Sequence, residues 1–315
     1  MTVIAPAVTA RIGDLEYTGH VVSADVELGL LPAVDRAALT LPRAVEVSAA
    51  PGDLASLELT GADGAETVLT GTVHSVAHGL ETTRVVLAGP ATLLGARRPA
   101  DAYSGQDATA VVRALASDAD VDVGTVTLTA QLPAYIAHQG RTAAEHVAAL
   151  AQLEGALAAF DADGALQIGA PGPVAQRALK YGRELLHFVT ASLPQPAARI
   201  PVGLGSAGSA SAAGALKASR SVVPASVSGV RVSTPVLRVA ATASTAQQGA
   251  EAAATRAATS VTALCILVPA LRPTQSIEVQ DLPGAQSAGP FVLTRVRHRI
   301  TPYGEARTEL VGEGA

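Results

Sequence analysis

Aromatic residues and cysteine are scarce in this chain of 315 residues. It has no Trp, five Tyr and three Phe, and its one cysteine is Cys265. A single thiol excludes a disulfide within the chain. Cys265 lies in the apolar run Leu264–Leu271, and we interpret it as a small buried hydrophobe. So few aromatic rings also argue against a glycoside hydrolase, which needs platforms on which sugars stack.

Charge is equally sparse. Charged residues make up 16% of the chain and the net charge is −5, so no basic surface predicts nucleic acid as a partner. No apolar run approaches the roughly 18 residues of a membrane span, and the N-terminus lacks the basic and apolar regions of a signal peptide. Ala is very frequent, as in proteins from GC-rich bacterial genomes. We expect a protein made in the bacterial cytoplasm, with no membrane insertion.

Motifs for common chemistry are missing as well. The chain has no G-x-x-x-x-G-K-[ST], G-x-S-x-G or H-E-x-x-H sequence, and the glycines of 203–208 do not follow a strand and open a helix. His74 and His78 flank a predicted turn. A metal site built from them and a nearby carboxylate is the weaker interpretation, because turn histidines usually face solvent. We expect no catalytic residue, no cofactor and no metal.

Short segments rich in Val, Thr and Leu recur between Gly, Pro and Asp from Ala7 to about Leu94. This spacing is typical of a small antiparallel barrel or sandwich. We therefore predict a first β-module over residues 1–96. Its strands are expected at 8–13, 20–28, 37–41, 44–49, 54–61, 66–76 and 83–89.

Helix signals replace the strand pattern after this module. Residues 107–118 have apolar side chains at the spacing of one helix face, and Ser104 with Asp107 resembles a capping box. A better capping box, Thr142 with Glu145, begins a second helix.

This second helix is predicted to end at Gly155. The dipeptide Asp163-Gly164 then favours a tight turn between two short strands. Together the two helices and the hairpin predict a compact α+β insert over residues 97–172.

Strand character resumes at Leu179. The tract 203–221 is so rich in Gly, Ala and Ser that we predict a flexible loop. An Ala-rich helix is expected at about 244–263, and strand patterns lie on both sides of it. We therefore assign this helix to a second β-module over residues 173–315.

Two distant segments follow the same order of turns and strands. Residues 51–91 and residues 273–315 each run from a turn through three strands, and each places a histidine, His74 or His298, near the end of the middle strand. We interpret the pair as two related β-modules in one chain. The alternative is that two β-meanders with glycine turns resemble each other by chance.

The order of parts resembles the late-control protein D family, the baseplate hub proteins of contractile phage tails and related injection systems. Its Y-x-G-x-x-x-x-x-V-V-x-x-L-A motif is similar to residues 103–116, and its G-R-x-L-L-x-F strand to residues 181–189. A Gln, a capped helix and a hairpin follow the family order at 139–169. The closing helix and strands match at 246–310, with GPFVLTRVRH at 289–298.

The resemblance covers nearly the whole chain, with three departures. The usual polar loop is replaced by the bland tract 203–221. A P-G-D turn stands at 51–53 in the first module, whereas the second module has Arg272-Pro273-Thr274. No C-terminal spike follows the last strand, so the spike is expected to be a separate protein.

What the resemblance implies is a β-rich α+β protein with two similar antiparallel, tail-tube-like β-barrel modules. Hubs of this kind are homotrimers whose two barrels per chain form a six-fold-like ring. The ring stacks on the hexameric inner tail tube protein and presents three-fold symmetry to the spike protein. Other baseplate proteins are further expected partners, and the expected final location is the assembled phage tail or injection particle.

Contact surfaces in such a hub are expected at open strand edges and in loops that become ordered on contact. We predict them around His74 and His298 and in the loop that contains Gly203, Ser209 and Ser221.

Two other function classes stay open. The chain is alternatively a tail-tip binding module or adhesin. It is also, less favourably, a tail-associated peptidoglycan hydrolase, for which Glu145 or Asp161 would have to prove essential.

Overall fold

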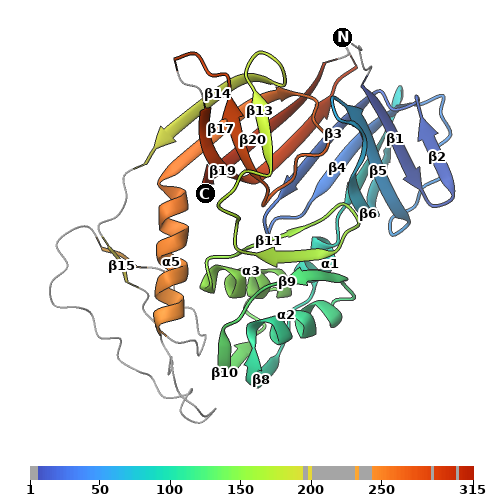
Figure 1. Cartoon of the computed structure of the whole chain (residues 1–315). Helices are drawn as coiled ribbons and strands as arrows, with labels where there is room; N and C mark the ends of the chain where they lie inside the picture. The colour runs from blue at the N-terminus through green and yellow to red at the C-terminus, as the bar shows by residue number, and fades with distance from the viewer. Residues whose placement is uncertain (1–5, 194–197, 201–230, 234–242, 285–286, 303–304) are drawn as a thin grey trace.

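The computed structural model describes residues 6–193, 198–200, 231–233, 243–284, 287–302 and 305–315. A large, mostly antiparallel sheet dominates the structure, and a smaller group of helices and short strands lies beside it (Figure 1). The predicted β-rich α+β fold class is confirmed. Within the described residues, no helix is long and apolar enough to cross a membrane.

The large sheet has 13 strands, drawn from both ends of the chain. Its N-terminal strands are β1 (Ala7–Ile12), β2 (Leu15–Thr18), β3 (Ser23–Gly29), β4 (Arg36–Pro42), β5 (Leu54–Gly61), β6 (Gly64–His78) and β7 (Thr82–Ala88). Its C-terminal strands are β13 (Arg177–Lys180), β14 (Leu185–Ser192), β17 (Thr259–Ile266), β18 (Ser276–Gln280), β19 (Ser287–Ile300) and β20 (Ala306–Gly314).

The strand order is β14-β17-β20-β19-β3-β4-β7-β6-β5-β1-β2, with β18 on β19 and β13 on β18. The two halves of the chain therefore meet where β3 pairs antiparallel with β19. One sheet runs through both predicted β-modules. The division into residues 1–96, 97–172 and 173–315 stays a prediction.

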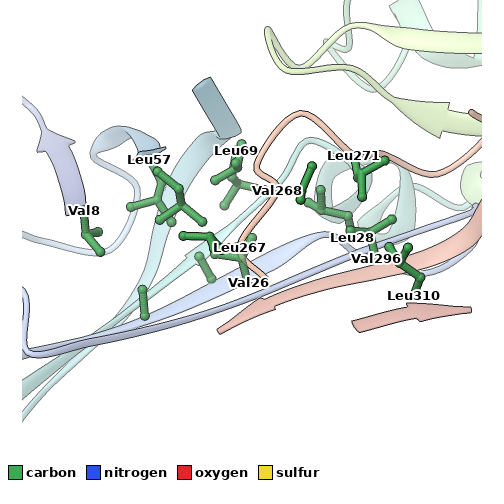
Figure 2. Close-up of a cluster of buried hydrophobic side chains, with 14 of the residues drawn as sticks. Val8, Val26, Leu28, Leu57, Leu69, Leu267, Val268, Leu271, Val296 and Leu310 are labelled. Carbon is green, nitrogen blue, oxygen red and sulfur yellow. The ribbon is translucent and has the colours of Figure 1, made fainter. Parts of the chain in front are cut away.

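Apolar residues alternate along these strands and place one face of the sheet in a single core. In β3 the alternation buries Ala24, Val26 and Leu28, and it leaves the residues between them partly exposed. Figure 2 shows side chains of both chain halves in this core, where Leu28 lies near Val296 and Val26 lies near Leu267. The halves are thus joined by burial as well as by backbone hydrogen bonds.

A second core belongs to the insert between the two halves. Its elements are α1 (Ala91–Ala96), β8 (Asp101–Asp107), α2 (Ala108–Ser117), β9 (Val123–Val126), β10 (Gln131–Ala137), α3 (Ala143–Leu153), β11 (Leu157–Phe160) and β12 (Leu166–Gly169). Strands β8 and β10 form one small sheet, and β11, β12 and β9 form another.

The two helix starts of the insert differ in how well the sequence predicted them. The Thr142–Glu145 capping box is confirmed, with the Thr142 N–H donating to the Glu145 carboxylate at 2.7 Å. The capping box at Ser104 and Asp107 is wrong. Ser104 lies inside β8, and the Asp107 carboxylate itself caps α2 by accepting from the Ala110 N–H at 2.7 Å. Helix α2 begins only at Ala108 because residues 101–107 pair with β10 as strand β8.

The predicted hairpin is present as β11 and β12, but its turn is longer than two residues. The Asp161 carboxylate accepts from the N–H groups of Asp163 and Ala165, at 3.0 and 2.9 Å. Gly164 has a φ of 85°, a conformation that favours glycine. The turn is therefore organised by Asp161 rather than by the dipeptide alone.

Two elements of the β-modules differ from expectation. Residues 44–49 form no strand, although Val45 and Val47 pack against the core. The Ala-rich helix is α5 (Ala243–Ala257), so the predicted end at Ala263 is wrong. Residues 259–266 instead form β17, because β14 and β20 flank them on both sides. Two short strands, β15 (Ala198–Ile200) and β16 (Arg231–Ser233), form a separate parallel pair.

Replacing Thr142 by Ala should destabilise the insert, because the Glu145 N–H loses its side-chain acceptor. We expect a loss of about 1 kcal/mol in the free energy of unfolding, measured by urea denaturation. The matched control is Thr125→Ala, at an exposed threonine of the same insert. Equal midpoints for the two variants would contradict the capping role.

Candidate assembly interface

The two β-modules repeat one another pair by pair. Six cross-strand pairs between β6 and β7, from Thr72↔Ala88 to His78↔Thr83, recur at a constant offset between β19 and β20, from Val292↔Glu313 to His298↔Thr308. Both ladders skip one residue at the same place, after Val73 and after Leu293. Matching β-bulges at matching positions are designed features of a fold. The internal repeat that the sequence indicated is therefore present.

The turn before the first repeated strand has also kept its geometry. Gly52 and Thr274 both have positive φ, 99° and 73°, in the region that L side chains rarely adopt. The side chains of Asp53 and Gln275 each accept from the backbone N–H three residues earlier, at 2.7 and 3.1 Å. The P-G-D turn therefore has a direct counterpart in the second module.

The equivalent histidines of the two modules are not the pair His74 and His298 that the order of turns and strands indicated. His74 is the residue skipped in the β6–β7 ladder, and its counterpart is Thr294. The counterpart of His298 is His78, which lies four residues after the same bulge. The pairing of His74 with His298 was wrong because only the hydrogen-bond register shows where the bulge falls.

Each of the two equivalent histidines contacts a threonine across the strand pair. His298 Nδ1 lies 2.9 Å from Thr308 Oγ1, and His78 Nδ1 lies 3.2 Å from Thr83 Oγ1. Their surroundings differ sharply, since His298 is fully buried whereas His78 is exposed.

Strand β3 explains this difference in burial. It pairs with the second half of β19, from Arg295↔Gly29 to Ile300↔Ala24, and covers His298 with Val26. We call this β3–β19 contact the internal seam. His298 thus lies within the chain's own seam and not on an open edge.

Ion pairs cover the other face of the internal seam. Arg297 donates to both oxygens of Asp25, at 2.7 and 2.6 Å. Glu27 lies 3.0 Å from Arg36 and 3.7 Å from Arg295. The hydrogen bonds from Arg297 hold the pKa of Asp25 below its ordinary value.

The buried side of the seam contains a neutral histidine. Thr308 Oγ1 accepts from the Val268 N–H at 2.9 Å, which leaves the hydroxyl proton for His298 Nδ1. Burial, together with the charge of Arg272, lowers the pKa of His298 to about 3. The seam therefore depends on an uncharged imidazole.

Two strand edges equivalent to those of the seam pair with no other strand among the described residues, and β14 has only an isolated bridge there, between Leu185 and Tyr181. One is β14, the counterpart of β3 and the last strand at one end of the sheet order. The other is 75–78, the second half of β6, which pairs with β7 alone because β5 covers only the first half.

Large apolar side chains are exposed on or beside these two edges. Val189 is 45% exposed on β14, and Leu186 and Leu193 are about as open. Leu80, just beyond β6, is 99% exposed. Edges of this kind invite pairing with another chain unless something covers them.

The residues named for contact from sequence alone are thus only partly near these edges. His74 is exposed at the bulge of β6, next to the open half of that strand. Gly203, Ser209 and Ser221 lie outside the described residues. Neither β14 nor His78 is indicated as a contact by the local sequence pattern, and the signal for both is the internal repeat once it is aligned by its bulges.

The carboxylates named for a hydrolase have structural roles. Glu145 closes the capping box of α3, and Asp161 organises the β11–β12 turn. Burial raises the pKa of the Cys265 thiol to about 12, which makes it a poor nucleophile. In the described part of the chain, no three His, Cys, Asp or Glu side chains gather as metal ligands would.

Comparisons with known proteins find similarity in structure alone. No protein-family model matches the chain, and no curated protein matches its sequence. The fold is similar to a tail protein from Neisseria meningitidis, with a TM-score of 0.73, 16% identity and coverage of 98% of this chain and 97% of that one. It is also similar to a 43 kDa tail protein of prophage MuSo2 from Shewanella oneidensis, with a TM-score of 0.66, 12% identity and coverage of 98% and 96%.

A third similar structure is an E. coli component of the type VI secretion system, which resembles the T4 bacteriophage tail proteins gp27 and gp5. Its TM-score is 0.61 at 12% identity, with coverage of 97% of this chain and 76% of that one. The chain therefore has the fold of these tail proteins over nearly its whole length.

The bidentate pair in the internal seam should contribute measurably to stability. In a double-mutant cycle with Asp25→Ala and Arg297→Ala, we expect a coupling of about 1 kcal/mol at pH 7, reduced by the partial exposure of both side chains. The folded-state pKa of Asp25 is depressed, so this coupling is present above about pH 4 and is lost as the pH falls through the folded-state value.

The matched control is the same cycle on Arg11 and Glu16, an ion pair on the exposed surface. We expect no measurable coupling there. Equal coupling energies in the two cycles would show that the Arg297–Asp25 pair contributes no more to the free energy of unfolding than an exposed surface pair does.

His298 should make folding sensitive to acid. Its folded-state pKa of about 3 lies below the unfolded value of about 6.5, so only the unfolded chain takes up the proton between these values. Stability is therefore full above about pH 6.5 and falls below it. Between pH 7 and 5 the parent should lose about 2 kcal/mol more unfolding free energy than His298→Gln.

This difference is measured by urea denaturation at both pH values. His20→Gln is the control, because His20 is exposed between β2 and β3 and lies on neither of the open strand edges. The control should follow the parent. A His298→Gln variant with the parent's pH dependence would contradict the role of the buried imidazole.

Proposed function

We propose that this protein is the structural hub of a contractile tail or injection-system baseplate, a homotrimer that adapts the hexameric inner tube to a trimeric spike. One observation carries the proposal. The chain contains the same β-module twice, joined by an internal seam, and each partner strand of that seam has an equivalent whose corresponding edge pairs with no strand among the described residues.

This arrangement of strand edges allows copies of the chain to form a closed ring. The seam joins two different strand edges, so it is a head-to-tail contact, which generates a ring when the rotation closes. Three chains with two modules each supply six similar positions. Such a ring has six-fold character toward a tube of six subunits and three-fold symmetry toward a spike.

The similar structures support the proposal at the level of the fold. Two of them are tail proteins, one of them from a prophage, and the third is a type VI secretion component that resembles T4 tail proteins. The roles found here for Glu145, Asp161 and Cys265 favour a structural protein over a hydrolase. The partners proposed are a second and third copy, the inner tube protein, a separate spike protein and other baseplate proteins.

Size-exclusion chromatography with light scattering tests the assembly state. We expect a mass of three copies of the 31.5 kDa chain at micromolar concentration, and stable binding to purified tube protein from the same genome. A monomer that binds neither tube nor spike would contradict the proposal. Binding of that monomer on a glycan array would instead support an adhesin.

A further inference from the structure

Resting on the proposed function, we infer the contact that closes the ring. The open edge of β14 in one copy pairs antiparallel with residues 75–80 of the next copy, in the register of the internal seam. The occupant of each edge is therefore a second copy of this chain. We call this contact the external seam.

The register follows from the repeat. Strands β4 and β17 pair with β7 and β20 at equivalent positions, as Leu41↔Thr83 and Cys265↔Thr308 show. Strands β3 and β14 continue this equivalence outward, because their pairings with β4 and β17 keep a constant offset. Each residue of β14 therefore has a defined counterpart in β3.

Three pairs of the external seam follow by transfer from the internal one. Arg297↔Glu27 becomes Ala77↔Ala191. His298↔Val26 becomes His78↔Thr190, and Val296↔Leu28 becomes Val76↔Ser192.

The exposure of His78 and Thr190 supports the same pairing of 75–80 with β14. In the internal seam His298 and Val26 are both fully buried, because each covers the other. Their counterparts, His78 and Thr190, are exposed on two separate edges of the same chain. An external seam in this register covers both of them at once.

The two seams differ in chemistry on their outer face. Arg297 and Asp25 of the internal seam correspond to Ala77 and Val189 of the external one, so the bidentate ion pair is replaced by apolar contact. Leu80, two residues after His78 at the end of the same segment, adds further apolar surface beside β14. The external seam is therefore closed by burial of apolar surface rather than by charge.

This difference makes the order of modules specific. If β3 of another copy occupied the edge at 75–80, Asp25 would face Ala77 in place of Arg297 and lose both hydrogen bonds. Strand β3 therefore pairs more favourably with β19 of its own chain than with residues 75–80 of another copy. The apolar edge of β14 is left for the first module of the neighbour, so the modules alternate around the ring.

Paired cysteines test the register in the full chain. Ala77→Cys with Ala191→Cys places the two thiols on directly opposed residues, at a Cα separation within the range of a disulfide. The matched control is Ala77→Cys with Val189→Cys, two positions out of register on the same face, where diagonal neighbours lie about 7–8 Å apart. Cys265 stays in both variants, because it is buried.

After mild oxidation we expect covalently closed trimers from the matched pair, with at least about fivefold more cross-linked chain than from the control. Trimers by light scattering without this preference would overturn the external seam and leave the hub proposal standing. Monomers of all variants and of the parent would overturn both.

A single substitution provides an independent measurement. Val189→Lys should raise the trimer dissociation constant at least about tenfold, because a charge then occupies an apolar seam. Leu15→Lys is the matched control, since Leu15 is equally exposed on β2 but lies at the other end of the sheet. Equal dissociation constants for the two variants would overturn the external seam.

Discussion

The pairing of β3 with β19 is the constraint on which the rest of the structure depends. It joins strands from the two ends of the chain into one sheet, and it turns two small modules with open edges into one body with a shared core. Its inner face is apolar and includes a neutral histidine, whereas its outer face carries the bidentate pair of Arg297 with Asp25. Backbone hydrogen bonds, burial and charge therefore all act at the same contact.

The two modules share a backbone around this contact but differ in their side chains. Their backbones match down to equivalent bulges and a left-handed turn residue, Gly52 in one module and Thr274 in the other. The side chains differ where one edge is paired within the chain and its equivalent is not. His298 is sealed inside the chain, and its twin His78 is exposed on an edge. Among the described residues, only one of the two equivalent edge pairings is therefore made within the chain.

Much of the local structure was predictable because its causes are local. The capping box of Thr142 and Glu145 and the hairpin signalled by Asp163-Gly164 depend on residues a few positions apart, and both are present, although Asp161 organises a longer turn. The end of α5 was not predictable in this way. An Ala-rich sequence favours a helix, but residues 259–266 lie between β14 and β20, and two ladders of hydrogen bonds outweigh intrinsic propensity.

Periodicity and turn residues were enough to predict that the chain is β-rich and that a small helical insert follows the first run of strands. They indicated a repeated meander but left chance resemblance open. The equivalence of the histidines came from the folded chain, since a bulge is defined by hydrogen-bond register and leaves little trace in composition. The fold also shows which strand edges pair within the described residues and which do not. Pairing between β3 and β19 spans most of the chain, and no local pattern encodes a contact between residues so far apart.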